Sequence, residues 1–345
     1  MEENTHEQGL FQNDYGEGAH PLIMQRLMET NLEHTCGYGL DDYSLRAQAL
    51  IREKVGQPQA QVHMMAGGTS ANMIAISAFL RPYEGVIAAD SGHINVHETG
   101  AVEGSGHKVM IAKSKDGKVL PEGVRAVVAA NPDEHTVFPR MVYISQSTEV
   151  GTVYTLDELR ALRAVCDELG LILYMDGARL GSALAASGIT LRELGEVCDC
   201  FYIGGTKNGL LFGEAMVIVN PALQPHFRHM IKNRGGMMAK GRLCGVMFLT
   251  AFENDDYFAW ARHANDMADR IRAAMKRAGM PFFQENVGNQ VFPILTAEQD
   301  AAFSERFAYE RWGVLEDGRI AVRFVTSWAT TEADVKILCD AIEAM

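Results

Sequence analysis

Residues 171–179, Leu-Ile-Leu-Tyr-Met-Asp-Gly-Ala-Arg, join a short apolar run to a polar end. An apolar run of this length, bounded by polar residues and glycine, predicts a strand that is buried on both faces. An acid at the carboxyl end of such a strand points into the crevice where α/β proteins bind ligands. Asp176 could instead cap the next helix, so this stretch alone indicates the fold better than it indicates a site.

Short apolar runs on both sides of this strand alternate with helical stretches. Thr155–Glu168 begins with a capping signal, Thr155 followed by Glu158, and Ser70–Leu80 has apolar residues at helical spacing. The other predicted strands of this region are Gln61–Met65, Gly85–Ala89, Arg140–Ile144, Asp199–Ile203 and Glu214–Val219. The alternation predicts an α/β protein with a mainly parallel sheet covered by helices on both faces.

The pattern changes after about Ala251. A long charged helix, Trp260–Ala278, is followed by short strands and a final helix, Thr331–Ala344. The predicted strands are Gln290–Leu295, Tyr309–Leu315 and Arg319–Val325. We therefore expect an irregular N-terminal arm (1–20), a large domain (21–250) and a smaller α+β C-terminal domain (251–345).

The composition excludes several classes of protein. The chain has 345 residues, 47% of them hydrophobic, and a net charge of 31 − 44 = −13. These values exclude intrinsic disorder and argue against a general nucleic-acid binder. The six cysteines lack paired metal-site spacing, so we expect reduced thiols and no metal. With no signal peptide and no run of 18 apolar residues, we expect a cytoplasmic protein that does not enter a membrane.

Three further motifs lie next to predicted strands. Gly67–Asn72 follows a strand and opens a helix, so it is either a phosphate cradle or a plain turn. Lys207 lies among glycines between two apolar strands, and it is either a buried lysine with a lowered pKa or an exposed hairpin residue. His93 follows Gly85–Ala89. With Asp176, these groups match what pyridoxal 5′-phosphate (PLP) requires.

The motifs give the chain its resemblance to a known family. From about Asn13 to the last helix, it resembles the threonine aldolase group of fold-type-I PLP enzymes, within the wider β-eliminating lyase family. The family's Ser-Gly-Thr-x-Ala-Asn is met by Gly67–Asn72 with glycine in the first place, and its Asp-Gly-Ala-Arg is met in full by Asp176–Arg179. Its Ser-Lys-Gly is changed, because Thr206 replaces the serine and Asn208 comes before the glycine.

The resemblance implies a role for each matching residue that holds the cofactor. Lys207 would form the Schiff base, and Asp176 would keep the pyridine nitrogen protonated. The phosphate would bind at Gly68 and Thr69. His93 would stack on the ring, and Arg179 would hydrogen-bond the cofactor or order Asp176.

The resemblance also implies roles toward the substrate. Arg323 matches the arginine that holds the α-carboxylate, and Asn13 would assist it. Tyr38 matches a tyrosine near the active site of the neighbouring subunit, which implies a homodimer or homotetramer with shared sites. His93 or His135 is the candidate general base.

The implied reaction is retro-aldol cleavage of an L-β-hydroxy-α-amino acid of the threonine, allo-threonine or phenylserine type, which gives glycine and an aldehyde. β-Elimination or transamination on the same scaffold is the nearest alternative. A cofactor-binding protein without turnover is a second alternative. A metal hydrolase built on His93-x-x-x-His97-Glu98 is a third.

Overall fold

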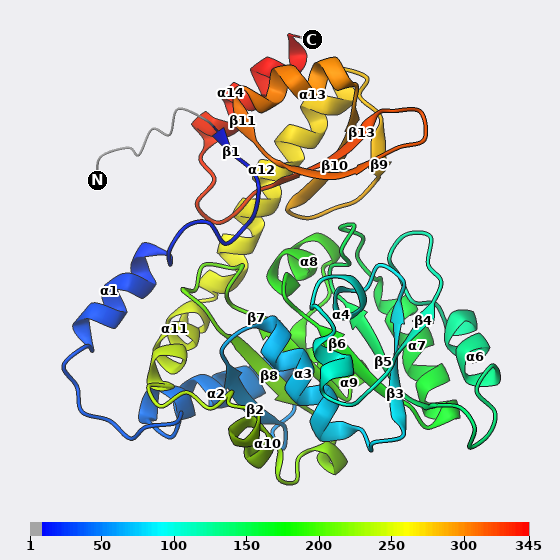
Figure 1. Ribbon diagram of the computed structural model, residues 1–345. Helices are drawn as coiled ribbons and strands as arrows, with labels where there is room; N and C mark the ends of the chain where they lie inside the picture. The colour runs from blue at the N-terminus through cyan, green and yellow to red at the C-terminus, as the bar shows by residue number, and fades with distance from the viewer. Residues whose placement is uncertain (1–8, 345) are drawn as a thin grey trace.

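The computed structural model describes residues 9–344, and it contains two layered units joined by a long helix (Figure 1). The larger unit has a seven-stranded sheet in the order β2-β8-β7-β6-β5-β3-β4. Its strands are β2 (Gln61–Met65), β3 (Glu84–Ala89), β4 (Val109–Ala112), β5 (Phe138–Ser145), β6 (Ile172–Asp176), β7 (Cys200–Gly204) and β8 (Glu214–Ile218). Only β8 runs antiparallel to its neighbours. The mainly parallel sheet predicted from the sequence is therefore confirmed, and β4 is a strand that the prediction lacked.

The strands of this sheet bury both faces, because successive side chains point to opposite sides. In β6, Leu173 and Met175 belong to one hydrophobic core, whereas Ile172 and Tyr174 belong to the other. Helices cover both cores. They are α1 (Pro21–Glu29), α2 (Asp42–Val55), α3 (Gly68–Phe79), α4 (His93–Val96), α5 (Ala101–Gly104), α6 (Pro121–Ala129), α7 (Leu156–Leu169), α8 (Leu180–Ser187), α9 (Leu191–Val197), α10 (Phe227–Asn233) and α11 (Arg242–Glu253). The capping box predicted for Thr155 and Glu158 is present at the start of α7.

The smaller unit is an antiparallel four-stranded sheet packed against helices. Its strand order is β12-β13-β10-β9, and α12, α13 and α14 complete it (Figure 1). The elements are α12 (Asp256–Arg277), β9 (Phe282–Gln284), β10 (Gln290–Leu295), α13 (Ala297–Ser304), β11 (Phe307–Ala308), β12 (Glu310–Val314), β13 (Ile320–Val325) and α14 (Glu332–Glu343). The long helix α12 belongs to both units, because Trp260 lies in the core of the large one and Ile271 in the core of the small one.

The N-terminal arm is packed where the structure describes it. β1 (Gly9–Leu10) pairs in parallel with β11, and Phe11 is fully buried in the core of the small unit. The prediction of an irregularly packed arm is therefore wrong only for the two-residue strand Gly9–Leu10, because residues 11–20 pack without regular secondary structure, while residues 1–8 lie outside the described chain. The predicted boundary between residues 250 and 251 falls in the last turn of α11, and the division into domains stays a prediction.

Within residues 9–344, the structure contains no helix that is both long enough and apolar enough to cross a membrane.

Candidate active site

A cavity of about 260 Å³ opens at the carboxyl ends of β5, β6 and β7. Parallel strands gather the residues that follow them at one edge of the sheet, which explains why separate motifs meet here. The cavity is lined by Gly67, Gly68, Thr69, His93, Ser145, Ser147, Thr148, Glu149, Asp176, Ala178, Arg179, Tyr202, Thr206, Lys207, Phe212 and Glu214, together with Ala66. All six residues predicted to hold a cofactor therefore line one cavity.

The amino end of α3 forms one wall of the cavity. Gly67 precedes the helix, and no side chain caps this end. A side chain at Gly67 would begin in open space, whereas one at Gly68 would come within 2.9 Å of the Tyr202 hydroxyl oxygen. The N–H groups of the first helical turn and the positive end of the helix dipole therefore face the cavity, and they suit an anion such as phosphate.

Asp176 lines the cavity, and its carboxylate accepts several hydrogen bonds. The Asn72 amide donates to Asp176 Oδ2 at 2.9 Å, and the Tyr143 hydroxyl donates to the same oxygen at 2.7 Å. The Tyr202 hydroxyl donates to the other oxygen. Burial alone would raise the pKa of Asp176, but the positive charge of His93 and these three donors hold it below its usual value. Asp176 is therefore a fixed anion, and Arg179 rather than Asp176 occupies the N-cap position of α8.

Two close backbone contacts place Asp176 against the lysine loop. A Cβ at Gly177 would lie 1.9 Å from the Tyr202 carbonyl oxygen, and one at Gly204 would lie 2.4 Å from the Ala178 carbonyl oxygen. Only glycine allows the segment after β6 to approach the end of β7 this closely. The glycine of the Asp-Gly-Ala-Arg motif thus sets the separation between Asp176 and Lys207.

Lys207 lines the cavity from the loop between β7 and β8. Its Nζ makes no hydrogen bond or ion pair within residues 9–344, and it lies 5.8 Å from the centre of the Tyr15 ring. Burial and the charge of Arg179 lower the pKa of Lys207 against the opposing charges of Asp14, Asp176 and Glu214. A lowered pKa leaves a larger neutral, nucleophilic fraction of the amine.

Glu214 fixes the loop that carries Lys207. Its two oxygens accept hydrogen bonds from the Gly205 N–H at 2.9 Å and the Thr206 hydroxyl at 2.8 Å. Burial raises the pKa of Glu214 to about 7. Thr206, which replaces the family's serine, therefore uses its hydroxyl within the loop.

His93 lines the cavity, and a hydrogen bond to the buried carboxylate of Glu98 sets the orientation of its ring. His93 Nδ1 lies 2.9 Å from Glu98 Oε1, and the Asn72 amide donates to that same oxygen at 2.8 Å. Burial lowers the pKa of His93, but the Glu98 hydrogen bond and the charge of Asp176 outweigh that effect and raise it. Hydrogen bonds through Glu98 and Asn72 thus connect His93 to Asp176.

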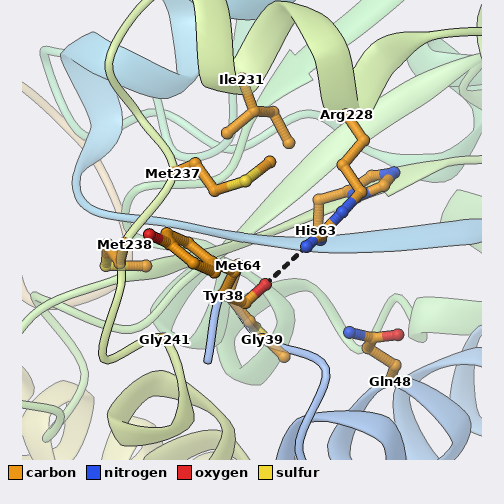
Figure 2. Close-up of a pocket in the computed structure, with 10 residues that line it drawn as sticks. All are labelled: Tyr38, Gly39, Gln48, His63, Met64, Arg228, Ile231, Met237, Met238 and Gly241. Atoms are coloured by element: carbon orange, nitrogen blue, oxygen red, sulfur yellow. Dashed lines mark hydrogen bonds between the residues drawn. The ribbon is translucent and has the colours of Figure 1, made fainter. Parts of the chain in front are cut away.

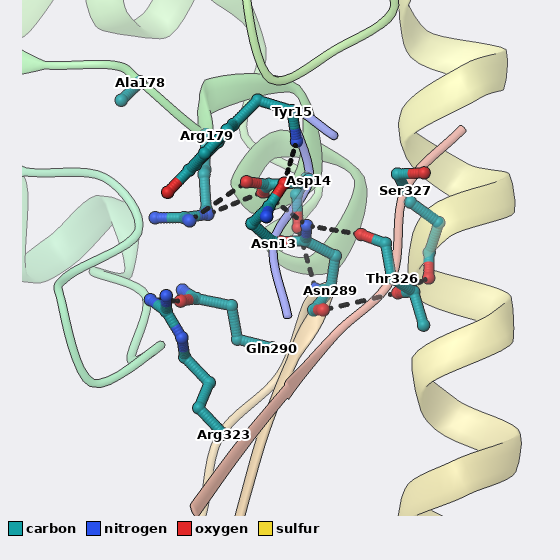
Figure 3. A network of polar contacts seen from close by, with 12 residues as sticks. Asn13, Asp14, Tyr15, Ala178, Arg179, Asn289, Gln290, Arg323, Thr326 and Ser327 are labelled. Carbon is teal, nitrogen blue, oxygen red and sulfur yellow. Dashed lines mark hydrogen bonds and ion pairs between the residues drawn. The ribbon is translucent and has the colours of Figure 1, made fainter. Parts of the chain in front are cut away.

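Arg179 is held by the N-terminal arm. Arg179 Nε and Nη2 donate to the two oxygens of Asp14 at 2.7 and 3.1 Å, and the Asn289 amide donates to Asp14 at 2.9 Å (Figure 3). Burial alone would raise the pKa of Asp14, but the charges of Arg179 and Lys207 lower it overall. The prediction that Arg179 orders Asp176 is wrong, because the arm supplies its carboxylate partner.

Asn13 does not assist Arg323 in this structure. Its Oδ1 accepts the Tyr15 N–H at 3.0 Å, and it lines a different cavity, beside Thr330 and Thr331. The buried member of the Asn13–Asp14 pair is Asp14. The arm therefore does enter the site region, as expected, but one residue further along the chain than predicted.

Arg323 extends from β13 toward the same region (Figure 3). Its Nη1 donates to Gln290 Oε1 at 3.0 Å, and its Nη2 pairs with Glu310. Arg323 Nε and Gln290 Nε2 are buried donors without a partner within residues 9–344. Burial and the nearby charge of Arg179 lower the pKa of Arg323, which nevertheless stays charged because it is an arginine. A guanidinium held in place by Gln290 and paired with a carboxylate, Glu310, is of the kind that binds a carboxylate ligand.

Residues 17–298 match the family described as "Beta-eliminating lyase".

This chain belongs to the β-eliminating lyase family.

The individual relatives agree with this assignment. The chain is 33% identical to a protein named low specificity L-threonine aldolase from Pseudomonas, over 97% of each chain. It is 27% identical to a Saccharomyces cerevisiae protein of the same name, over 83% of this chain and 74% of that protein. The solved structure of Leishmania major threonine aldolase is similar, with a TM-score of 0.96 and 42% identity over 97% of this chain and 98% of that one.

More distant structures show the fold alone. A double mutant of Thermus thermophilus aspartate aminotransferase matches with a TM-score of 0.70 at 14% identity, over 98% of this chain and 91% of that one. The fold class predicted from the sequence, that of fold-type-I PLP enzymes, is therefore confirmed.

His135 lies outside the site of this lyase-family protomer. It is exposed in the loop before β5, and its backbone N–H donates to Asp133 at 3.1 Å. Because β5 has eight residues at about 3.3 Å each, roughly 25 Å of strand separates His135 from the cavity. The prediction of His135 as a catalytic base is wrong for the protomer's own cavity, since this residue lies at the amino edge of the sheet.

Tyr38 also lies away from the cavity of its own protomer. It lines a small separate pocket of about 30 Å³ with His63, Arg228 and Met237 (Figure 2). The Arg228 guanidinium donates to the Tyr38 carbonyl at 2.8 Å, and Lys232 Nζ lies 4.9 Å from its ring centre. Tyr38 has a positive φ of 61° and is 45% exposed. Its predicted role toward a neighbouring subunit stays a prediction.

Several residues of the site were not found from the sequence. They are the buried acids Asp14, Glu149 and Glu214, and Glu98 was considered only as a possible metal ligand. Glu149 follows the predicted strand Arg140–Ile144 and Glu214 begins the next strand after Lys207, so the strand-end rule could have indicated both. Within residues 9–344, no group of three or more His, Cys, Asp or Glu side chains is placed to hold a metal ion, so His93, His97 and Glu98 do not form the metal site considered above.

Proposed function

We propose that this chain is a PLP-dependent carbon–carbon lyase that cleaves L-β-hydroxy-α-amino acids to glycine and an aldehyde. Threonine, allo-threonine and phenylserine are substrates of this type. The observation that carries the proposal is the arrangement of Lys207, Asp176 and the uncapped end of α3 around one cavity. That cavity belongs to a family member whose relatives are named low specificity L-threonine aldolases.

The groups around the cavity fit PLP in charge and in kind. The open amino end of α3 at Gly67 and Gly68 suits the phosphate, and the permanent anion of Asp176 suits a protonated pyridine nitrogen. Lys207 offers an amine with a lowered pKa to the aldehyde of the cofactor. The His93 ring, held by Glu98, would lie against the cofactor ring. When bound, PLP supplies an electron sink for the pair left on Cα.

The substrate carboxylate would bind at Arg323. The guanidinium is fixed by Gln290, and the substrate carboxylate would take the place of its present partner, Glu310. A planar guanidinium can hold a carboxylate through two parallel hydrogen bonds, which a lysine cannot do. By holding the carboxylate, Arg323 would fix the orientation of the substrate and so select which bond of Cα is cleaved.

A product assay separates this reaction from its nearest alternatives. Purified protein with PLP is incubated with L-threonine, L-allo-threonine and L-phenylserine. Glycine plus an aldehyde supports the proposal, whereas ammonia plus a keto acid identifies elimination, and transfer of the amino group to an added keto acid identifies transamination. A yellow protein that releases none of these products contradicts all three reactions.

Substitution of the lysine tests the cofactor assignment. Lys207→Ala should abolish both turnover and the PLP absorbance that remains on the protein after borohydride reduction, because only a lysine amine forms the reducible bond. Lys113→Ala, at an exposed lysine, is the matched control and should behave as the wild type. Full turnover by Lys207→Ala would overturn the assignment.

The proposed enzyme is a cytoplasmic homodimer or homotetramer in which Tyr38 serves the site of a neighbouring subunit. This part of the proposal is supported by the position of Tyr38, half exposed beside Arg228 and Lys232 and away from its own cavity. The free thiols of all six cysteines suit a reducing compartment. Light scattering during size-exclusion chromatography measures the assembly. A catalytically active monomer would contradict the shared site.

A further inference from the structure

Glu149 is a buried carboxyl group whose two oxygens have different surroundings. It follows β5 and lines the same cavity as Lys207 and Asp176. Its Oε1 accepts the Ser145 hydroxyl at 2.7 Å and the His93 backbone N–H at 3.0 Å. Within residues 9–344, no other residue donates a hydrogen bond to its Oε2, and this oxygen is not enclosed in protein as Glu98 Oε2 is. One oxygen is thus fixed, and the other is open to the cavity.

Burial and the surrounding charges raise the pKa of Glu149, so this carboxyl group is suited to taking up and releasing a proton. Burial raises its pKa, the Ser145 hydrogen bond lowers it, and the charge of Asp176 raises it again, so that the pKa lies above its ordinary value overall. The titratable and charged groups that face Glu149 are Asp176 from β6, His93 from α4, Arg179 before α8, Tyr143 from β5 and Tyr154 before α7. A carboxyl group with a raised pKa is a stronger base than an ordinary one.

The other carboxyl groups of the cavity, Asp176 and Glu214, already have hydrogen-bond partners. Asp176 is a fixed anion with three side-chain donors. Glu214 uses both oxygens to hold the lysine loop. His93 directs Nδ1 to Glu98, and the second oxygen of Glu98 is enclosed in protein. Glu149 is the one carboxyl group of the described cavity with a hydrogen-bonded oxygen on one side and an open oxygen on the other.

We propose that Glu149 is the acid–base residue of the cleavage, and that its Oε2 takes the proton of the substrate β-hydroxyl. This inference rests on the proposed function and gives Glu149 the task that the sequence assigned to His93 or His135. The O–H bond breaks as the proton moves to Oε2, the C=O bond of the aldehyde forms, and the Cα–Cβ electron pair stays on Cα. Glycine requires one proton on Cα, so the proton released from the hydroxyl balances the reaction and no further reactant is needed.

The variant Glu149→Gln tests this role with little structural change. The amide oxygen can still accept from Ser145 and from the His93 N–H, but it cannot take a proton. We expect kcat/KM for L-threonine to fall by about 10²- to 10⁴-fold, with the PLP absorbance of the loaded protein unchanged. Glu196→Gln, on the exposed face of α9, is the matched control and should keep wild-type activity.

The pH dependence separates a proton acceptor from a structural carboxyl group. A base must be ionised, so the acidic limb of the wild-type kcat/KM profile should follow the raised pKa of Glu149 and disappear in Glu149→Gln. Ser145→Ala removes the hydrogen bond that lowers this pKa and should therefore move the limb to higher pH. Infrared difference spectra of the protein without substrate, wild type minus Glu149→Gln, should show a protonated carboxyl band that titrates over the same range.

Each outcome of these measurements bears on the inference. A Glu149→Gln variant that retains the wild-type rate and acidic limb overturns it, as does a Ser145→Ala variant whose limb does not move. A wild-type protein that releases no glycine and aldehyde overturns the proposed function and this inference together. Wild-type cleavage with an unaffected Glu149→Gln variant overturns only the role of Glu149.

Discussion

Replacing Asp14 by asparagine should destabilise the protein far more than replacing an exposed acid. Asp14 and Arg179 have side-chain exposures of 0% and 12%, and two hydrogen bonds join them. Asparagine preserves the volume and can still accept one hydrogen bond, but it leaves the Arg179 charge buried without a counterion. Breaking a buried ion pair from one side costs about 3–5 kcal/mol of the free energy of unfolding. We expect a loss in this range for Asp14→Asn at neutral pH.

The assay is urea unfolding at fixed protein concentration, followed by fluorescence, with Asp317→Asn as the matched control. Asp317 forms a similar pair with Arg319, but both side chains are about half exposed, and solvent screens such pairs. The control should therefore unfold at nearly the wild-type urea concentration. If Asp14→Asn loses no more stability than Asp317→Asn, the pair does not behave as a buried ion pair and the reasoning is refuted.

The pH dependence of the same measurement gives an independent check. The pKa of Asp14 is lower in the folded protein than its unfolded value of about 3.9. A group of this kind contributes stability above its unfolded pKa, and that contribution is lost as the pH falls through the folded pKa. The difference in the free energy of unfolding between the wild type and Asp14→Asn should therefore be largest at neutral pH and shrink below about pH 4.

Three further predictions concern other parts of the site. The pKa of Glu214 is raised to about 7, so ionising this group in the folded state costs stability. The free energy of unfolding measured in urea should therefore decline between about pH 4.5 and 7, by about 3 kcal/mol at most. Glu214→Gln should not show this decline. Gly177→Ala should cost at least about 1–3 kcal/mol in thermal unfolding, because its Cβ would overlap a backbone carbonyl, whereas Gly104→Ala, with open space around it, should be tolerated. Arg323→Lys should raise KM for L-threonine roughly 10- to 100-fold through loss of charged hydrogen bonds, while Arg319→Lys, at an exposed neighbour, should not change it. A KM unchanged in Arg323→Lys would place the carboxylate elsewhere.

The sequence best predicted the positions of residues that directly follow a single strand. The apolar run before Asp176 indicated that this acid follows a buried strand, and the position of Lys207 between two strands indicated a second strand end. Each motif alone left another interpretation open, and the rule that parallel strands end together joined them into one site.

The sequence predicted poorly where contacts join distant segments. The partner of Arg179 is Asp14, which lies on the arm and is fixed by Asn289 from the small unit, and no local pattern relates these three residues. His135 was misplaced because it precedes its strand instead of following it, so the same strand-end rule excludes it once the strand direction is considered. Glu149 was not identified from the sequence because its burial depends on packing across the cavity, although its place after a strand could have indicated it.

The pairing of β1 with β11 has a consequence for when the site can form. Gly9 aligns with Phe307, and Asp14 is held by Asn289, so the earliest described residues of the chain find their partners near its end. During synthesis the large sheet can assemble while the arm still lacks a partner, because domains form as their residues leave the ribosome. The Asp14 carboxylate that pairs with Arg179 is therefore fixed by Asn289 only after the small unit has been made. The region around the cavity is completed last, when residues 9–14 reach their partners in the small unit.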